Sequence, residues 1–590
     1  MRRTLILTAL MALALTAFGQ AVPRDVAADY DELTDTKPHD GPEAWDGMSR
    51  PAELAWGTTD VRYKKFDLPE GTSTRTLRLR AWRGERVHAQ AVLWTRSGLD
   101  SVRLSVGGLR AGRAVIPDSA VSASFVRYVM TDEPNPDGSG CGLRPVKSDW
   151  DSSLVADVID IARVRPVSAR SVQPVWLTVR VPRDAQPGRY RGTLTVTAAR
   201  HERLSLPFEL EVSSRTLTPP REWKLNLDLW QNPYAVARYH GVPLWSQAHF
   251  DAMRPLMKML ADAGQRAITT TLMYEPWGGQ TEDFYLSMIT RTRRIDGTWT
   301  YDYAVFDRWV EFMTDDVGID GLISCYSLIP WSLRFDYFDQ ATNRVEFITA
   351  RPGEKAYADY WVPFLKDFAA HLRRKGWFER TAIAMDERPM EAMREAIKVI
   401  KAADPAFKIS LAGGYHPEIL DDLYYLSVPY GTQFPDSVKA KRRSRGQLSC
   451  VYTCCTEAFP NIFTFSAPAE AAWTAIHAVA GDYDGYLRWA VNSWTADPLR
   501  DSRFTRFAAG DTYNIYPGPR SSIRFERLVE GLQAAEKVRL LREEFSARGE
   551  RRKLDRLNRA VGQFTPAGMK AGKQTAGQMV SHLHELLNTL

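Results

Sequence analysis

The sequence has few of the residues that metal and redox enzymes depend on. Its 590 residues include only 10 His and 5 Cys, and it contains no H-E-x-x-H motif and no zinc-type C-x-x-C pair. A phosphate-binding P-loop is absent, and no G-x-G-x-x-G follows the first strand of the second half of the chain. We therefore expect neither a metal nor a cofactor.

A strong charge of one sign is also missing. The 77 Lys and Arg against 71 Asp and Glu give a formal net charge of +6, which is small for this length and argues against nucleic acid as a partner. With 44% hydrophobic and 25% charged residues, the chain is typical of a folded, multidomain protein rather than a disordered one. Aromatic residues, by contrast, are plentiful, with 18 Trp, 23 Tyr and 24 Phe.

Long apolar runs are absent except at the N-terminus. Leu5 to Leu15 is apolar apart from Thr8, follows Arg2 and Arg3, and precedes small residues suited to cleavage near Ala21. This pattern predicts a secretory signal peptide over residues 1–21 and an exported protein, periplasmic or extracellular. The alternative is a membrane anchor, but the run is shorter than the roughly 20 residues that a span needs. Residues 22–50 would then form an N-terminal extension, and the mature protein has no expected membrane span.

The odd number of cysteines leaves at least one without a partner in the chain. In an oxidising compartment, a disulfide between Cys450 and Cys454, or between Cys450 and Cys455, is possible. Cys141 and Cys325 are the remaining two, and the sequence does not decide the pairing.

Residues 51–215 have the pattern of an antiparallel β-sandwich. Leu77 to Trp82 alternates apolar and polar residues, as a half-buried strand does, and Pro182 to Gly188 is dense in turn residues. Further short strands are expected at 87–94, 102–106, 121–129, 175–181, 190–196 and 204–212. Short strands separated by such turns predict a sandwich.

Residues 220–545 change to short apolar runs alternating with amphipathic helices. Strands are expected to begin near Lys224, Ala267, Gly321, Ala382, Lys408, Tyr425, Leu448 and Gly485. Helices are expected at 250–263, 305–313, 357–372, 390–402, 467–480 and 523–541. This alternation predicts a (β/α)8 TIM barrel, with a doubly wound open sheet as the alternative. A helical tail over 546–590 completes a multidomain β and α/β chain.

The ends of the predicted barrel strands are rich in aromatic residues. Active sites of such barrels lie at these strand ends, and sugar rings stack on aromatic faces, so we expect a glycan partner. Tyr415 or Tyr452 could donate a hydroxyl hydrogen bond, Trp489 or Trp494 could form the floor of the site, and Asn492 could bind a sugar hydroxyl. The other candidates for lining the site are Trp230, Tyr274, Trp277, Tyr326 and Trp331. Each of these residues could instead be ordinary packing.

The strongest catalytic candidate is the acid pair Asp386-Glu387. It closes the apolar strand Thr381 to Met385, whereas Asp31-Glu32 lies in the polar extension, where we expect it to be solvated, and Asp132-Glu133 precedes a turn. Neighbouring carboxyls can hardly flank a glycosidic bond from two sides, about 5 Å apart. They suit substrate-assisted chemistry, in which the 2-acetamido oxygen of the sugar is the nucleophile. One acid orients that group, and the other, kept protonated by apolar surroundings and its anionic neighbour, donates a proton.

These residues carry a resemblance to a known family. The chain resembles glycoside hydrolase family 123, the β-N-acetylgalactosaminidases, at Arg83 to Arg86, Val181 to Gly192, Ala384 to Glu387 and Arg488 to Trp494. The resemblance implies that Asp386 orients the acetamido group and that Glu387 is the general acid/base. It also implies retention of configuration through an oxazolinium intermediate. Many relatives have Pro directly after the acid pair, whereas here Arg388 precedes Pro389.

The sequence thus predicts an exported retaining hydrolase that removes terminal β-linked N-acetylhexosamine, with GalNAc as the expected sugar. Two alternatives stay open: a glycosidase of other specificity on the same scaffold, and a catalytically inactive glycan-binding protein. The sequence leaves the oligomeric state undetermined.

Overall fold

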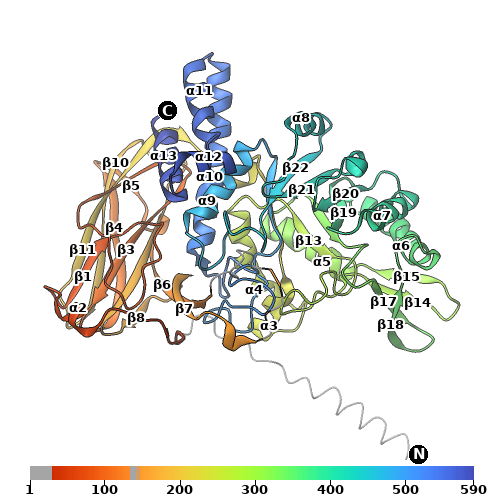
Figure 1. Cartoon of the computed structure of the whole chain (residues 1–590), viewed down its shortest axis with the longest axis horizontal. Coiled ribbons are helices and arrows are strands. Elements are labelled where there is room, and N and C mark those ends of the chain that lie inside the picture. The colour runs from red at the N-terminus through yellow and green to blue at the C-terminus, as the bar shows by residue number, and fades with distance from the viewer. Residues whose placement is uncertain (1–28, 133–140, 143, 145) are drawn as a thin grey trace, which may run out of the picture.

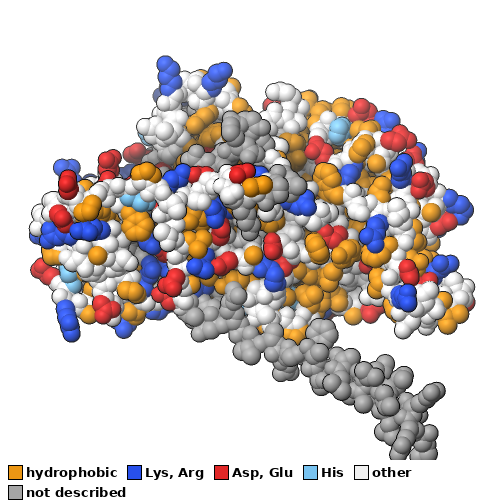
Figure 2. All heavy atoms as spheres, turned by 60° about the horizontal axis from the view of Figure 1, so that its bottom comes forward, with side chains coloured by type: hydrophobic (Ala, Val, Ile, Leu, Met, Phe, Trp, Pro, Cys, Tyr) orange, Lys and Arg blue, Asp and Glu red, His pale blue; other side chains and the backbone are white. Residues whose placement is uncertain are grey.

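The computed structural model describes residues 29–132, 141–142, 144 and 146–590. The signal peptide expected at 1–21 and Glu133 of the second acid pair lie outside the described residues. Figure 1 shows a β-sheet part at one end of the molecule, a barrel part at the other, and C-terminal helices between them. On the face in Figure 2, Lys and Arg side chains are interspersed with Asp and Glu over both parts, in keeping with the small net charge.

Two sheets pack face to face in the N-terminal part. Their orders are β1-β3-β9-β6-β7-β24 and β2-β11-β10-β4-β5, with β8 paired to β4. The strands are β1 (Ala52–Trp56), β2 (Leu77–Arg83), β3 (Arg86–Thr95), β4 (Leu99–Ala111), β5 (Ala114–Ile116), β6 (Val121–Thr131), β7 (Ser153–Ile159), β8 (Val164–Val167), β9 (Ser171–Arg180), β10 (Gly188–Ala199) and β11 (Leu204–Thr216). Inward side chains of both sheets, such as Leu93, Leu177, Leu194 and Phe208, form one buried core.

All seven strands expected here are present. The sequence reading missed β1, β5, β7 and β8, and a short helix, α2 (Pro42–Asp46), precedes the first strand. The solvated position expected for the first acid pair is wrong for Glu32. Its side chain is 3% exposed and forms ion pairs with Lys65 at 2.6 Å and Arg127 at 2.7 Å, because the extension lies against the sandwich.

Eight parallel strands form the barrel sheet. They are β12 (Asn226–Leu229), β13 (Ile268–Thr271), β16 (Ile323–Tyr326), β19 (Thr381–Asp386), β20 (Lys408–Ala412), β21 (Tyr425–Pro429), β22 (Leu448–Tyr452) and β23 (Gly485–Arg488). The order β12-β23-β22-β21-β20-β19-β16-β13 follows the chain around a ring without reversal, unlike a doubly wound sheet. Between β12 and β13 no strand pairing is continuous in the described residues. The Leu227–Gln265 bridge joins them there, together with side-chain hydrogen bonds such as those between Gln231 and Thr269, so the ring is nearly closed.

Helices occupy most of the connections between barrel strands, and one more follows the last strand. They are α3 (Pro233–His240), α4 (Gln247–Ala261), α5 (Ala304–Glu311), α6 (Lys355–Arg374), α7 (Met390–Ala403), α8 (Asp436–Ser444), α9 (Ala469–Ala480) and α10 (Ile523–Ala547). All six expected helices are among them. A 3-10 helix, Pro417–Asp422, takes the place of an α-helix between β20 and β21, so the strict (β/α)8 pattern is broken there.

The loops after β13 and β16 contain a small four-stranded sheet that the sequence analysis did not predict. Its order is β15-β14-β17-β18. The strands are β14 (Thr290–Arg293), β15 (Trp299–Asp302), β17 (Arg334–Asp339) and β18 (Arg344–Thr349).

The C-terminal segment joins the two parts. The two-residue strand β24 (Ser521–Ser522) lies directly before α10 and pairs with β7 at the edge of a sandwich sheet. The following helices are α11 (Arg551–Val561), α12 (Pro566–Gly572) and α13 (Ala576–Thr589). Residues of α11 and α13 share a buried cluster with α9, α10 and Trp82 of β2, and Met569 of α12 packs against it. Figure 1 shows these helices grouped between the two parts. In the described part of the chain, no helix is both long and apolar enough to cross a membrane.

Candidate active site

The acid pair lies where an apolar strand meets the mouth of the barrel. All six residues of β19 are buried, and Asp386 is the last of them. Glu387 and Arg388 form the turn, and Pro389 then caps α7. The sequence folds this way because the short apolar run fits a barrel strand that is covered on both faces, while proline suits the start of the next helix.

Asp386 is 9% exposed, and neither carboxyl oxygen has a hydrogen-bond partner among the described residues. Burial raises its pKa to about 6, against lowering by the Arg388 charge and the Trp277 indole N–H, and the Glu387 charge raises it further. A buried carboxyl without a partner at a strand end is typical of a group that acts on a ligand.

Glu387 has different surroundings. Its side chain is exposed at the mouth, and one oxygen accepts a hydrogen bond from the Gly414 backbone N–H at 3.1 Å. The loop after β20 passes so close that a Cβ on Gly413 would lie 3.3 Å from the Glu387 Cγ. The apolar surroundings that the sequence suggested for the proton donor are therefore absent at Glu387, and it is Asp386 that is buried.

Three of the predicted aromatic residues meet beside the acid pair. The ring centroids of Trp230 and Tyr326 are 4.4 Å apart, and Trp277 lies 5.3 Å from each. All three are buried, and the indole N–H groups of Trp230 and Trp277 have no hydrogen-bond partner among the described residues. Together with Asp386 they bring unsatisfied donors and acceptors to one end of the barrel.

Two further predicted residues border the pair. Tyr452 ends β22, and burial together with the charges of Cys454, Glu387 and Asp386 raises its pKa. Trp331 is 58% exposed, and its ring lies 4.0 Å from the guanidinium carbon of Arg388. Arg388 in turn places Nη2 3.9 Å from Asp386 Oδ2 and donates from Nη1 to the Glu387 carbonyl.

Tyr274 and Tyr415 pack against other aromatic rings. The ring of Tyr274 contacts Phe284 and Phe347, the latter in the small sheet. The ring of Tyr415 packs against Phe434, with centroids 4.9 Å apart. The proximity of both to strand ends was foreseen, but their side chains belong to neighbouring packing.

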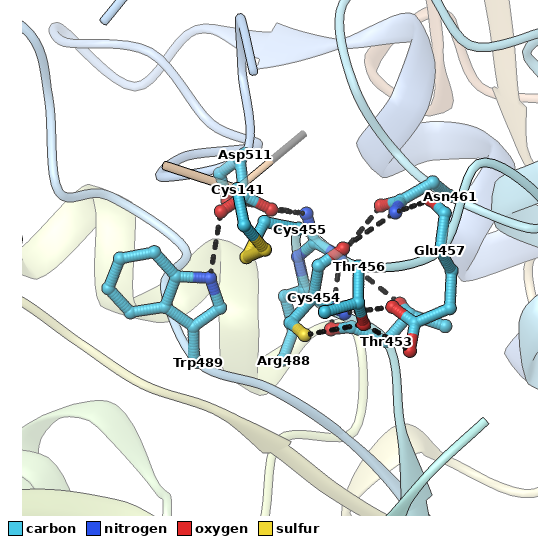
Figure 3. Close-up of a disulfide and its surroundings, with 10 residues drawn as sticks. All are labelled: Cys141, Thr453, Cys454, Cys455, Thr456, Glu457, Asn461, Arg488, Trp489 and Asp511. Atoms are coloured by element: carbon cyan, nitrogen blue, oxygen red, sulfur yellow. Dashed lines mark hydrogen bonds and ion pairs between the residues drawn. A yellow bond between two sulfur atoms is a disulfide. The ribbon is translucent and has the colours of Figure 1, made fainter. Parts of the chain in front are cut away.

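The loop after β23 uses its polar groups for structure. The amide of Asn492 is buried and exchanges two 2.8 Å hydrogen bonds with the backbone of Asn232. Trp494 is fully buried and donates to the Ile515 carbonyl at 2.8 Å. These polar atoms bond inside the protein, which supports structural roles for Asn492 and Trp494, and their sugar-binding roles stay predictions. Trp489 borders the aromatic cluster and donates to Asp511 at 3.1 Å (Figure 3).

A second buried acid was not among the site residues predicted from the sequence. Asp228, on β12, is fully buried and accepts a hydrogen bond from the Tyr425 hydroxyl at 3.1 Å. Burial raises its pKa to about 7, although the Tyr425 hydroxyl and the nearby Trp230 indole N–H lower it. In the sequence, Asp228 could have been recognised as an acid between two leucines at the end of a predicted strand.

The disulfide differs from both pairings that the sequence suggested. Cys141 of the sandwich side is bonded to Cys455 in the loop after β22, while Cys325, Cys450 and Cys454 are free thiols. Figure 3 shows how that loop is held. Asn461 donates to the carbonyls of Cys454 and Glu457, and Arg488 reaches both Asn461 and Asp511. Cys450 cannot take part because it is buried among barrel strands, near Asn226.

Within the described ranges, no three His, Cys, Asp or Glu side chains gather in a way that could hold a metal ion. The arrangement offers instead two adjacent carboxyls, one buried and one exposed, below an aromatic rim.

Comparison with known proteins covers both parts of the chain. Residues 230–541 match the family described as glycoside hydrolase 123, catalytic domain, and residues 56–198 match the glycoside hydrolase 123 N-terminal domain. No curated protein matches the chain.

Among solved structures, a family 123 glycoside hydrolase from Clostridium perfringens, studied for glycolipid glycan hydrolysis, is similar with a TM-score of 0.81 and 26% identity. The match covers 91% of this chain and 99% of that one. A Bacteroides ovatus GH5 xyloglucanase matches at 12% identity over 81% of this chain and 100% of that one, but its TM-score of 0.28 supports no argument.

Proposed function

The chain belongs to glycoside hydrolase family 123, and on that basis we propose that it is an exported, retaining enzyme that removes terminal β-linked N-acetylhexosamine from glycans. GalNAc is the expected sugar, on the resemblance of the acid-pair and Arg488–Trp494 segments to the family. Glycolipid glycans are the proposed substrates, by extension from the Clostridium perfringens enzyme. Export is supported by the N-terminal sequence and by a disulfide, which persists in oxidising compartments.

The observation that carries the mechanism is the position of Asp386 and Glu387 as consecutive residues at the end of one barrel strand. A two-carboxylate retaining mechanism requires one carboxyl to protonate the leaving group and the other to attack the anomeric carbon from the opposite face. Consecutive residues approach a bound sugar from the same side, so Asp386 and Glu387 cannot divide the work in that way. The nucleophile is then the carbonyl oxygen of the 2-acetamido group.

In the first half of the reaction, the Glu387 carboxyl donates its proton to the glycosidic oxygen. The acetamido oxygen forms a bond to the anomeric carbon as the bond to the leaving group breaks. Asp386, as a carboxylate, accepts a hydrogen bond from the acetamido N–H and stabilises the positive charge of the oxazolinium ion. Tyr452, which ends β22, is the proposed donor of a hydrogen bond to the acetamido oxygen.

In the second half, the Glu387 carboxylate takes a proton from water, which adds to the anomeric carbon and opens the oxazolinium ring. Two displacements at one carbon give net retention. The aromatic cluster of Trp230, Trp277 and Tyr326 supplies the apolar wall, and a sugar over the mouth would exclude water from the exposed Glu387.

The test is a panel of aryl β-GalNAc, aryl β-GlcNAc and aryl β-galactoside. We expect turnover of an N-acetylhexosaminide and little of the galactoside, which has no acetamido nucleophile. Glu387→Gln should lose about 10²–10⁴-fold in turnover, and more with poor leaving groups, because these need the proton most. Proton NMR of the first product should show the β-anomer.

Glu391→Gln is the matched control, because Glu391 is an exposed residue of α7 four positions along. It should leave activity unchanged. Comparable cleavage of the plain galactoside would exclude the substrate-assisted mechanism, and glycan binding without turnover of any substrate would favour an inactive binding protein.

A further inference from the structure

Arg388 places a buried positive charge directly against the acid pair. Its side chain is 9% exposed, and Nη2 lies 3.9 Å from Asp386 Oδ2, which is too long for a hydrogen bond but close for two charges. Its Nε and Nη2 atoms have no hydrogen-bond partner among the described residues. The guanidinium therefore acts on Asp386 through charge rather than through a fixed two-point bond.

Trp331 holds this guanidinium in place. The Arg388 Cζ lies 4.0 Å from the centroid of the Trp331 ring, a cation–π geometry. The loop after β13 fixes Trp331 itself. Its backbone N–H donates to the Pro276 carbonyl at 3.1 Å, and a Cβ on Gly278 would lie 3.0 Å from the Trp331 Cβ. A side chain that is 58% exposed thus has a defined position and covers one face of the arginine.

We propose that Arg388, held on the Trp331 ring, is a positioning residue for the acid pair and keeps Asp386 anionic and available to the 2-acetamido group. The proposal rests on the proposed function, because only substrate-assisted chemistry requires Asp386 as a carboxylate.

The groups around Asp386 show why a cation is needed. Glu387, the next residue, adds a negative charge beside Asp386. The neighbouring strands β16 and β22 contribute Tyr326 and Tyr452, which carry no positive charge. Asp228 of β12 shares Tyr326 as a neighbour, and His416 lies beside Gly414, next to Glu387. The Trp277 indole and Arg388 are the groups that lower the pKa of Asp386.

The sign of the effect follows from these contacts. An opposite charge at this distance lowers a carboxyl pKa by about 1–3 units. Removing the Arg388 charge should therefore raise the pKa of Asp386 above its present value of about 6. Asp386 would then be protonated at pH values where the native enzyme has it ionised. The acid limb of the profile, which is the fall of kcat/KM at low pH, would therefore move to higher pH.

The experiment compares pH profiles of kcat/KM for the full chain and four variants on the aryl N-acetylhexosaminide that it cleaves. For Arg388→Gln we expect the acid limb to move up by about one pH unit or more, with about tenfold lower activity below the limb. Activity should return towards that of the native enzyme above the new limb. Arg388→Lys keeps the charge and should keep the limb near its native position.

The Trp331 pair tests the second half of the proposal. Trp331→Leu should move the limb in the same direction as Arg388→Gln by a smaller amount, because the guanidinium can turn towards water. Trp331→Phe keeps a ring and should leave the limb in place. Thermal melting of each variant checks that the fold is intact.

An equal loss of activity by Arg388→Gln at every pH, with the acid limb unmoved, would overturn the proposal and indicate contact with the leaving group instead. If the native protein cleaves no N-acetylhexosaminide, the proposed function fails on its own. The Asp386 carboxyl can then be titrated by infrared difference spectra of native protein against Asp386→Asn. If Arg388→Gln does not raise the pKa measured in that way, the charge role of Arg388 fails as well.

Discussion

Single carboxyl groups in the barrel differ in what surrounds them. Asp386 has a cation at 3.9 Å, whereas Asp228 is fully buried and accepts a hydrogen bond from the Tyr425 hydroxyl. Burial is the leading cause that raises the pKa of both, to about 6 for Asp386 and about 7 for Asp228. The two acids therefore change charge within the range in which the protein is expected to work.

Replacing Asp228 tests this at the level of one residue. A carboxyl whose folded-state pKa is raised contributes its stability below the unfolded value, about 3.9, and loses it as the pH rises through the folded value, about 7. Asp228→Asn removes the ionisation while keeping an acceptor for Tyr425. We expect the variant to gain stability relative to the native protein between pH 5 and pH 8, by at most about 3 kcal/mol.

Thermal melting at the two pH values measures this difference. Asp422→Asn, at an exposed position in the barrel, is the control and should follow the native protein at both. Parallel loss of stability by the native protein and Asp228→Asn between pH 5 and pH 8 would show that Asp228 is not the titrating group.

The sequence predicted one of these acids and not the other. Asp386 stands out because it ends an apolar run and is followed by a second acid. Asp228 is a single acid on β12, and its importance depends on Tyr425 and Tyr326, which come from distant strands. Likewise, Asn492 has the polarity of a sugar ligand, and only the fold shows that Asn232 already satisfies its amide.

Strands and helices could be predicted from the sequence where their buried side gives a regular pattern of apolar residues. Most of the eight barrel strands lie on short apolar runs, and the six expected helices carry buried apolar residues. The small sheet was not predicted because strands such as β14 (Thr-Arg-Thr-Arg) are polar on both faces. Helix α8 was not among the six expected helices for a different reason. Its buried positions include Arg442, which donates to the carbonyls of Leu423 and Leu448, so a cation stands where an apolar residue is usual.

The crossing of α9 and α10 allows a test of helix packing. Gly531 of α10 faces α9 so closely that a Cβ there would lie 2.4 Å from the Ala472 carbonyl oxygen. Gly531→Ala should lower the free energy of unfolding by about 1–3 kcal/mol, because this strain exceeds the roughly 1 kcal/mol that alanine gains in a helix. Urea unfolding, followed by circular dichroism, measures it.

Gly572→Ala in α12 is the matched control, since nothing lies within 4 Å of a Cβ at that position. It should leave stability unchanged or raise it slightly. Equal effects from both substitutions would mean that α9 and α10 are not in close contact at Gly531.

At the scale of the whole molecule, a covalent bond ties the sandwich to the barrel mouth. Cys141 and Cys455 are 314 residues apart in the chain. The sequence suggested partners within a few residues of each other. The actual pairing depends on how the two parts meet, which local patterns do not encode.

Removing this bond should weaken the whole protein. We expect Cys141→Ser to lower the free energy of unfolding by about 2–4 kcal/mol under oxidising conditions, and reducing agent should abolish the difference. Cys454→Ser is the matched control, because Cys454 is the free thiol beside the bonded Cys455. Urea unfolding and titration of thiols in denaturant check the result. A loss caused by Cys454→Ser and not by Cys141→Ser would contradict this pairing.

The strand β24 makes the two parts a single structural unit. It extends the sandwich sheet beside β7, and the residues around it bring two cations to buried sandwich acids. Arg520 pairs with Asp160 at 2.6 Å and Arg524 with Asp157 at 2.9 Å. A chain cut between sandwich and barrel would leave β7 without its outer neighbour and both acids without these partners. In evolutionary terms, a recombination at residue 216 that replaced the sandwich would also have to supply new partners for Arg520, Arg524 and β24.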